Sequence, residues 1–484
     1  MRQVWSAGFG LTAMLYSSTA LAQKYDGSGA PSYIPHTMQE ALASAYLTNP
    51  TLQQERATLR AADEGVPTAL AGWRPKVTGT FGATYYTGRS VYAGSRSLDQ
   101  PLAPSTGSFN QYDVPGYTAG VQIQQPIYTG GRTTAQTHQA VNKVMAERAH
   151  LISVEQQVFT NVVSAYVNVI QGEQLLQLNI NNERVLEEQL KATTERFHVG
   201  EITRTDVAQA QAAYASAKAQ RQQSEGTLQT AQATYMQIIG MAPPPNLVPP
   251  QPLALPVKSE KEAVALAVAN NPDVIEALFS EASQKDAVSV QMAALMPTVS
   301  ATAAYQHSRN QQSNRSENDY KSATLNVQVP IYQGGSEYAA VREAKQQAQA
   351  QHRAVDIQRR TAAQAASSNW QKLISYKAAI DSNRAAIKAG YVALDGVERQ
   401  AIVGTSTTLE VLQQQSTLLS AQVALVQSLS SMVTSSYAVA SAIGRLTARD
   451  LHLNVPLYDE QAYYNAVKDR LWGINDYAVG QPGR

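Results

Sequence analysis

Cysteine is absent from the 484-residue sequence. The chain therefore contains no disulfide, no thiol nucleophile, no thiolate metal ligand and no cysteine that can carry a lipid anchor. Charge is also scarce, because only 15% of the residues are charged and the formal net charge is +1. Such a chain has neither the basic field that nucleic acid needs nor an acidic tail. We expect no nucleic-acid partner.

The familiar motifs of catalysis and cofactor binding are missing as well. The segments GGRTT and GGSEY do not fit the GxxxxGK[ST] pattern of a phosphate-binding loop. Neither GxSxG nor HExxH occurs. The seven histidines are scattered, and no pair has the spacing of metal ligands. We expect a protein that is not an enzyme and that has no cofactor and no metal site.

The first 22 residues, MRQVWSAGFGLTAMLYSSTALA, predict a secretory signal peptide. Arg2 provides the basic start, an apolar stretch follows, and Ala20-Leu21-Ala22 forms a small-x-small cleavage site. Beyond residue 22 we find no run of 18 apolar residues and therefore predict no transmembrane helix. An exported chain of this kind can still span a membrane as a β-barrel, whose signature is alternation of apolar and polar residues.

The sequence is internally duplicated. Asn49-Pro50 matches Asn271-Pro272, and Pro126 matches Pro330, so that the two copies differ in length only between these points. The Pro-rich stretch MAPPPNLVPPQPLALP separates the copies and predicts an extended connector. The expected organisation is a signal peptide at 1–22, a first repeat at 23–240, a connector at 241–258, a second repeat at 259–444 and a C-terminal periplasmic segment at 445–484.

Each repeat contains two segments with period-2 alternation. The four predicted strands cover about 76–87, 116–127, 298–306 and 320–331, and polar loops at 88–114 and 307–319 join them in pairs. One face of each strand is apolar and the other carries Gln, Asn and Thr. About 10 residues are enough to cross a membrane when a strand is tilted. A soluble sheet with one wet face gives the same alternation, but the export signal favours a membrane barrel.

Each strand pair is followed by a long helical pattern. The predicted long helices cover about 132–199 and 336–403, and shorter returning helices cover about 203–240 and 407–444. Two adjacent apolar stripes on the first long helix indicate packing on two sides, as in a closed ring of helices; the stripes are Val158, Val162, Ala165, Val169 and Phe159, Val163, Tyr166, Ile170. Four strands cannot close a barrel alone. Three chains give twelve strands, and strand counting also leaves a dimer of eight open.

These features together resemble the TolC family of outer-membrane efflux and secretion channels. The resemblance covers essentially all of the mature chain and rests on the duplication, on PIYTGG and PIYQGG, and on the tips RFHVGEITRTDVAQAQ and AIVGTSTTLEVLQQQ. It implies a mainly α protein with membrane β structure. A homotrimer would form a 12-stranded barrel in the lipid of the outer membrane, continued by a periplasmic α-helical barrel.

The resemblance also implies a function. The chain would be the exit duct of a tripartite efflux or type I secretion system. Its periplasmic tip would be closed at rest and opened by a periplasmic adaptor (membrane fusion) protein and an inner-membrane pump of the ABC or RND type. The alternative is a periplasmic or surface coiled-coil scaffold or adhesin that has no channel activity.

Two groups of residues at the hairpin tips are carried over from the family. Adaptor contacts would fall at the turns, on Val199, Gly200, Thr203, Thr205, Val403, Gly404 and Thr407. A ring of acids just inside the tunnel mouth would include Glu410, whereas the second acidic position of the family is Gln413 here. Three carboxylates around a narrow axis favour cations. The same acid near a helix start can instead serve only to stabilise that helix.

The latch of the closed tip departs from the family pattern. Asp206 matches an acid that helps to hold the tip closed, but its usual Tyr and Arg partners would stand at Ala401 and Ser406. Arg204 offers a replacement charge, and a contact between Arg204 and Glu410 is one option. Asp206 can also act simply as a helix cap.

The repeated motif Pro-Ile-Tyr-x-Gly-Gly predicts the joint between barrel and tunnel. Proline is expected to end strand pairing because it has no amide to donate, tyrosine to lie at the membrane interface, and the glycines to allow a sharp change of backbone direction. The residues are Pro126, Tyr128, Gly130, Gly131, Pro330, Tyr332, Gly334 and Gly335. Tyr463, Tyr464 and Trp472 further suggest that the C-terminal segment packs on the helices as a collar.

Overall fold

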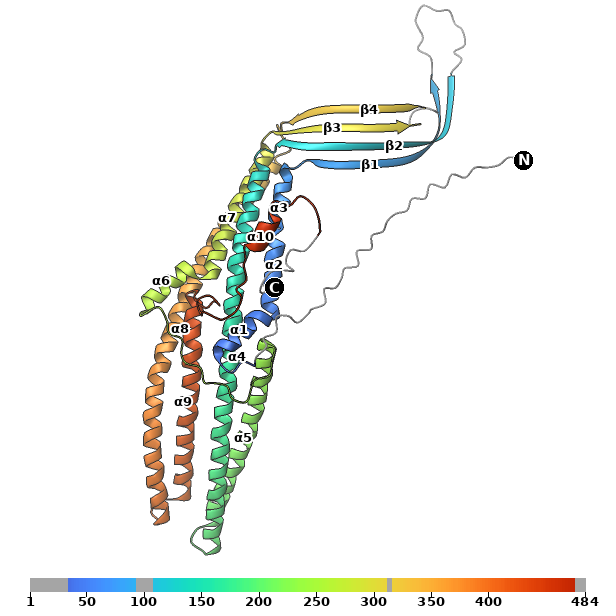
Figure 1. The fold of residues 1–484 in the computed structure, drawn as a ribbon. Helices are drawn as coiled ribbons and strands as arrows, with labels where there is room; N and C mark the ends of the chain where they lie inside the picture. The colour runs from blue at the N-terminus through green and yellow to red at the C-terminus, as the bar shows by residue number, and fades with distance from the viewer. Residues whose placement is uncertain (1–33, 93–107, 311–315, 475–484) are drawn as a thin grey trace, which may run out of the picture.

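A computed structural model describes residues 34–92, 108–310 and 316–474. The predicted signal peptide, the middle of the loop predicted at 88–114 and the last ten residues lie outside these ranges. The described chain forms a long column of helices with a four-stranded sheet at one end (Figure 1).

Two helical hairpins make up the column. Helices α4 (Arg132–His198) and α5 (Arg204–Ile239) form the first hairpin, and α8 (Ser336–Ile402) and α9 (Thr408–Ala442) form the second. Each of the two long helices has 67 residues, which corresponds to about 100 Å at 1.5 Å per residue. All four helices begin and end within two residues of the ranges predicted from the sequence.

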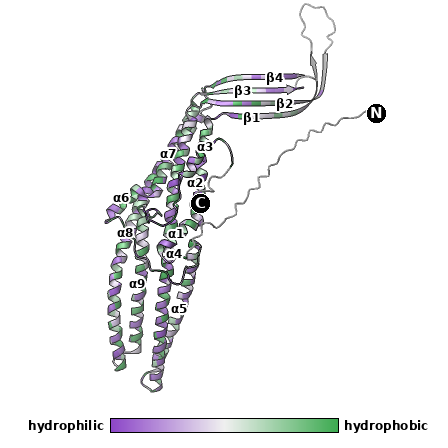
Figure 2. Cartoon of the chain, in the orientation of Figure 1, coloured by the Kyte–Doolittle hydropathy of each residue, from purple (hydrophilic) through white to green (hydrophobic). Residues whose placement is uncertain are grey.

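One of these helices is apolar for its length. Over the described residues, α9 is long and apolar enough to cross a membrane by length and composition alone, whereas we predicted no transmembrane helix. It packs against α8 in the second hairpin and against α4. Figure 2 shows hydrophobic and hydrophilic residues interleaved along the long helices, without a continuous hydrophobic block. We therefore assign α9 to the wall of the helical column.

Short helices brace the middle of the column in both repeats. The first repeat has α1 (Met38–Thr48), α2 (Pro50–Asp63), α3 (Gly65–Leu70) and the 3-10 turn η1 (Ala71–Trp73). The second has α6 (Glu260–Asn270), α7 (Pro272–Met292) and η2 (Ala293–Leu295). Asn49 caps α2 and its Nδ2 donates to the Ile238 carbonyl at 3.0 Å, while Asn271 caps α7 and donates to the Ala442 carbonyl at 3.1 Å. The duplication therefore extends to tertiary contacts.

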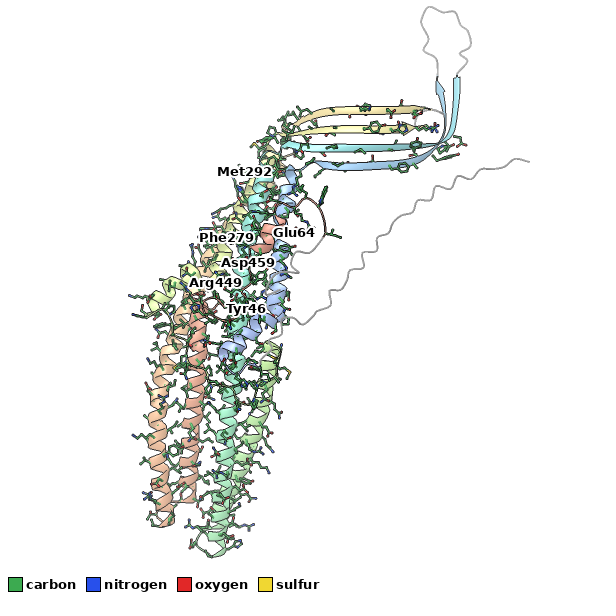
Figure 3. The ribbon with its side chains drawn as sticks, viewed as in Figure 1. Tyr46, Glu64, Phe279, Met292, Arg449 and Asp459 are labelled. Carbon is green, nitrogen blue, oxygen red and sulfur yellow. The ribbon has the colours of Figure 1, made fainter. Side chains whose placement is uncertain are left out.

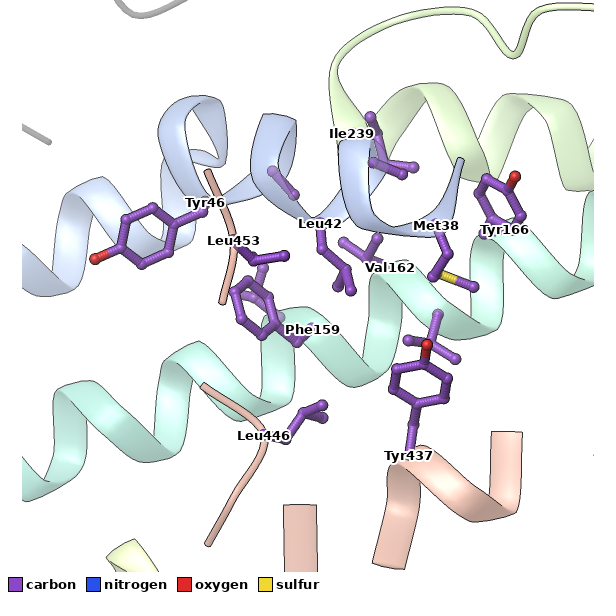
Figure 4. Packing of buried hydrophobic residues seen from close by; sticks show 14 of the residues in the cluster. Met38, Leu42, Tyr46, Phe159, Val162, Tyr166, Ile239, Tyr437, Leu446 and Leu453 are labelled. Carbon is purple, nitrogen blue, oxygen red and sulfur yellow. The ribbon is translucent and has the colours of Figure 1, made fainter. Parts of the chain in front are cut away.

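The hydrophobic core lies at the middle of the column, where α1, α4, α9 and the C-terminal segment meet (Figure 4). Met38 and Leu42 of α1 lie over Phe159 and Val162 of α4. All eight residues of the two predicted stripes on α4 are buried. The Tyr166 hydroxyl also donates to the carbonyls of His36 and Val248, at 2.7 and 2.8 Å, so that the connector between the repeats is fixed to the core.

The sheet is antiparallel throughout, with the strand order β1-β2-β3-β4. Its strands are β1 (Lys76–Tyr92), β2 (Ser108–Tyr128), β3 (Thr298–Arg309) and β4 (Glu317–Gln328). The register places apolar residues opposite one another, for example Val77 opposite Ile123 and Ala301 opposite Leu325. One face of the sheet is therefore apolar across all four strands, and its large side chains are exposed in the single chain.

The strands of the first pair are longer than predicted. β1 continues to Tyr92 and β2 begins at Ser108, so that both flanks of the predicted loop 88–114 belong to the ladder. The prediction stopped early because alternation is lost there, whereas backbone pairing does not need it. In the second pair, β3 extends to Arg309 and β4 covers Glu317–Gln328 instead of 320–331.

The C-terminal segment wraps the middle of the column and contains the short helix α10 (Ala462–Val467). The Arg56 guanidinium of α2 is buried between the rings of Tyr46 and Tyr458, 4.6 and 5.3 Å from their centroids. Glu155 of α4 accepts a hydrogen bond from the Ala448 amide at 2.6 Å. A cavity of about 570 Å³ remains between this segment and helices α2, α4 and α7, with Tyr46 and Arg449 in its lining (Figure 3).

Candidate functional site: the hairpin tips and the strand–helix joint

The two hairpin tips share one backbone design. At the first tip the Gly200 amide donates to the Phe197 carbonyl and the Glu201 amide to the Arg196 carbonyl, both at 3.0 Å. At the second, the Gly404 and Thr405 amides donate to the Ala401 and Gln400 carbonyls, at 3.4 and 2.9 Å. Both glycines are left-handed, with φ of 80° and 79°, which is the usual helix-ending turn. The glycines are therefore needed by the turn itself.

Both returning helices begin with a capping box built around the candidate acids. Asp206 accepts hydrogen bonds from the Thr203 amide at 2.9 Å and from the Thr203 hydroxyl at 2.6 Å, and the Asp206 amide donates to that hydroxyl. Glu410 accepts from the Thr407 amide at 3.1 Å and from the Ser406 hydroxyl. Each acid thus satisfies a free amide at a helix start.

These hydrogen bonds also set the ionisation of the two acids. The Ser406 hydroxyl, followed by the Thr407 amide, lowers the pKa of Glu410. The Thr203 side chain, followed by its amide, lowers the pKa of Asp206. Both carboxylates are therefore charged at neutral pH, and Glu410 is fully exposed at the end of the column. The helix-start role and a charged ring are compatible, because Oε2 of Glu410 accepts both of these hydrogen bonds and Oε1 accepts neither.

The remaining candidates at the tips are not brought together within one chain. In the described residues, no hydrogen bond or ion pair joins Arg204 to Glu410, and Gln413 is exposed one turn further along α9. Ala401 lies in the last turn of α8, and Ser406 contacts Glu410 instead of Asp206. Sequence reasoning missed one contact, an ion pair of 3.0 Å between Arg196 and Glu201 across the first turn. This ion pair could have been predicted from the opposite charges on either side of the predicted turn.

Large apolar side chains project from both tips. Val199 is 71% exposed and Val403 73%, and Ile402 and Phe197 beside them are exposed as well. Thr205 and Thr407 are exposed on the same turns. The two tips therefore offer paired apolar surfaces with hydroxyl groups at their edges. The exposure of Ile402 and Phe197 was not predictable from residue type.

At the other end of the column, the joint between sheet and helices differs between the repeats. Pro126 was expected to end strand pairing, but β2 continues to Tyr128, which pairs with Val299 after a bulge. Pro126 itself is opposite Ser300, and Ile127 is the extra residue of the bulge. In the second repeat β4 ends at Gln328, so that Pro330 follows the strand as expected. Tyr128 and Tyr332 are both exposed.

The four joint glycines, which were expected to allow a sharp change of backbone direction, all adopt a left-handed backbone. Their φ angles are 67° and 85° for Gly130 and Gly131, and 73° and 83° for Gly334 and Gly335. A side chain at Gly130 would also meet the Met296 Cβ at 2.8 Å and the Ala293 carbonyl at 2.9 Å, whereas the space around the other three is open. Gly131 and Gly335 directly precede α4 and α8.

Comparison with known proteins identifies a family that has this architecture. The model of the family described as outer membrane efflux protein matches residues 41–241 and 263–445. The chain belongs to the outer membrane efflux protein family. The two matched ranges correspond to the two repeats and leave out part of the connector and the C-terminal segment.

Named relatives of the outer membrane efflux protein family match over most of their length. The chain is 34% identical to the outer membrane efflux protein BepC of Brucella suis over 463 residues, which is 96% of this chain and 95% of the relative. It is 23% identical to the outer membrane protein TolC of Escherichia coli over 436 residues, covering 86% and 83%. The solved structure of CusC has the same fold, with a TM-score of 0.72 and 15% identity over 88% of this chain and 95% of that one.

Proposed function

We propose that this outer membrane efflux protein is a homotrimeric exit duct, gated at its helical tips and opened by a periplasmic adaptor and an inner-membrane pump. The observation that carries the proposal is the incomplete sheet. Strands β1 and β4 are its edges, and its apolar face is exposed in the single chain. Long unpaired edges pair with further strands, and three copies bring twelve strands into one closed barrel.

The duplicated hairpins support the same assembly. Helices α4 and α7 of one chain pack side by side, as do α7 and α8, so that the column is a curved wall made of both repeats. Three such walls extend the barrel into a helical tunnel. A coiled-coil scaffold without a channel leaves the apolar sheet face and both strand edges in water, which costs free energy.

The tips then form the periplasmic gate. Glu410 and the neighbouring Gln413 would line the constriction, and Asp206, with Arg204 beside it, would face a neighbouring hairpin. The driving force is assigned to the pump, because the glycine pairs of this chain do not fit the phosphate-loop pattern. Adaptor contact is assigned to the apolar turns around Val199 and Val403.

Site-specific photo-crosslinking tests the assignment of the tips. A photoreactive amino acid is placed at Val199 or Val403 in cells, and at the exposed Ile357 in the upper part of α8 as the control. We expect crosslinks to the same periplasmic protein from both tip positions and not from Ile357. Equal crosslinking at all three positions, or none at the tips while efflux or secretion continues, would contradict the assignment.

A further inference from the structure

The last described residues form an apolar loop that the rest of the chain does not cover. Leu471, Trp472 and Ile474 are 73%, 88% and 95% exposed; we call residues 471–474 the C-terminal apolar loop. The segment before it does pack, because Val467 is fully buried and the Tyr463 hydroxyl donates to Glu64 at 2.9 Å. The collar expected from the sequence therefore includes the tyrosines but not Trp472.

The loop has a defined shape. Gly473 is left-handed, with a φ of 103°, and a Cβ there would lie 2.5 Å from Nη2 of Arg470. The Arg470 Nε donates to the Trp472 carbonyl at 2.9 Å. The Arg470 guanidinium thus fills the inside of the turn, and the apolar side chains are presented outward.

A hydrogen bond to the residues just before the sheet fixes the position of the loop along the column. The Arg74 guanidinium donates to the Arg470 carbonyl at 2.7 Å, and β1 begins two residues after Arg74. Figure 1 draws the end of the chain, in dark red, as a loop beside α3 and below the sheet. The C-terminal apolar loop therefore lies at the level where the apolar strand face begins.

Other aromatic residues lie at the same end of the column, where the strands begin. Trp73, partly exposed, precedes Arg74, and its carbonyl accepts a hydrogen bond from Gln125 of β2 at 2.9 Å. Tyr128 and Tyr332 of the joint are also exposed. Tryptophan and tyrosine gather where a membrane meets water, because their rings are amphipathic. Trp472 extends this belt from the strands to the C-terminal segment.

The surroundings of the loop are basic. Lys76 is the first residue of β1, Arg74 lies two residues before it, and Lys468 and Arg470 directly precede the loop, where Asp469 is the one acid among the described residues 468–474. Cations near a membrane surface are attracted to anionic lipid. Apolar side chains beside a basic cluster are typical of a segment that lies in a membrane interface.

We propose that the C-terminal apolar loop inserts into the outer-membrane leaflet on the side of the helices, where its partner is a surface of anionic phospholipid. Trp472, Leu471 and Ile474 enter the acyl boundary, while Arg74, Lys76 and Lys468 meet the headgroups. The loop thereby fixes the depth of the strand–helix joint in the membrane. A neighbouring copy of the chain is the competing occupant, but it gives no reason for the excess of cations.

The absence of cysteine allows a direct test with spin labels. The full-length protein carrying Ile474→Cys is labelled and reconstituted into vesicles of phosphatidylethanolamine and phosphatidylglycerol. Contact of the label with oxygen and with a polar nickel chelate is measured by electron paramagnetic resonance. Leu325→Cys on the apolar face of β4 is the lipid control, and Thr205→Cys at the tip is the water control.

We expect the Ile474 label to behave like the Leu325 label, with oxygen contact at least about twofold above nickel contact. Adding Trp472→Ser, or using phosphatidylcholine alone, should reduce this ratio. Behaviour like the Thr205 label would overturn the proposal, and so would protection from both reagents, which indicates contact with a neighbouring copy. Single-channel conductance of the same samples reports separately on the duct.

Discussion

At the residue scale, the two candidate gate acids have a structural role at the starts of their helices. Asp206 and Glu410 each complete a capping box with a threonine three residues earlier. The sequence analysis left both roles open, and the structure shows the helix-start role within one chain. A constriction lined by Glu410 would be formed by three copies of the chain together.

Replacing Glu410 by Gln separates these roles. The amide oxygen of Gln can still accept from the Thr407 amide, so that the helix start is kept while the charge is removed. If three Glu410 carboxylates surround the axis, the cation preference of the channel should fall by about twofold or more. Reversal potentials of single channels in a salt gradient measure this, with Asp206→Asn as the matched variant of the other capping box. Unchanged selectivity would leave Glu410 with the helix-start role alone.

The joint glycines provide a second comparison of matched residues. Gly130→Ala combines a left-handed backbone, which costs about 1–2 kcal/mol for a residue with a Cβ, with a clash against Met296 and Ala293 that costs about 1–3 kcal/mol more. Gly334→Ala has the same backbone strain but open space. Unfolding midpoints of the purified variants should therefore fall further for Gly130→Ala. Equal shifts would show that the clash is relieved.

At the scale of elements, alternation and periodicity predicted most of the architecture. The long helices begin and end within a residue or two of their expected positions because proline-free helical stretches end at glycine turns with strong local signals. Strand ends were harder to predict. β1 and β2 extend past the point where alternation stops, and Pro126 lies within β2 at a bulge. Backbone pairing in these places depends on the partner strand, which a local pattern does not contain.

The packing of the C-terminal segment should depend on pH. Burial raises the pKa of Glu155 to about 7, against the opposing effects of the Ala448 hydrogen bond and Arg56, and burial likewise raises the pKa of Asp63 to about 7. The folded protein then binds more protons than the unfolded chain between about pH 4 and pH 7. Stability of the packed segment is therefore greatest below that range and falls as the pH rises through 7.

Hydrogen exchange of residues 446–453 at about pH 5.5 and pH 8, corrected for intrinsic rates, measures this effect. We expect lower protection at the higher pH, by on the order of 2–3 kcal/mol. Glu155→Gln keeps an acceptor for the Ala448 amide and should weaken the dependence, and adding Asp63→Asn should remove it. An unchanged dependence in the double variant would show that other groups are responsible.

At the scale of the whole molecule, the single chain leaves its sheet unclosed and its apolar sheet face uncovered. Its sheet has two open edges and an exposed apolar face, and its helices form a curved wall. Family membership and the fold agree with the duplication read from the sequence. Closure into a trimer, gating and partner choice arise between chains. For that reason the strand count predicted an oligomer but left a dimer open beside the trimer, and gating and partners were implied only by the resemblance.

Single-channel recording of the purified protein in a planar lipid bilayer tests the central claim most directly. The sample is extracted from membranes in detergent, and its mass is determined in parallel. The account predicts a particle of three chains, about 150 kDa when each chain of 52.2 kDa has lost its predicted 22-residue signal peptide, that inserts and conducts stable cation-preferring current. A protein recovered in soluble form, or a trimer that inserts without conducting, would contradict it.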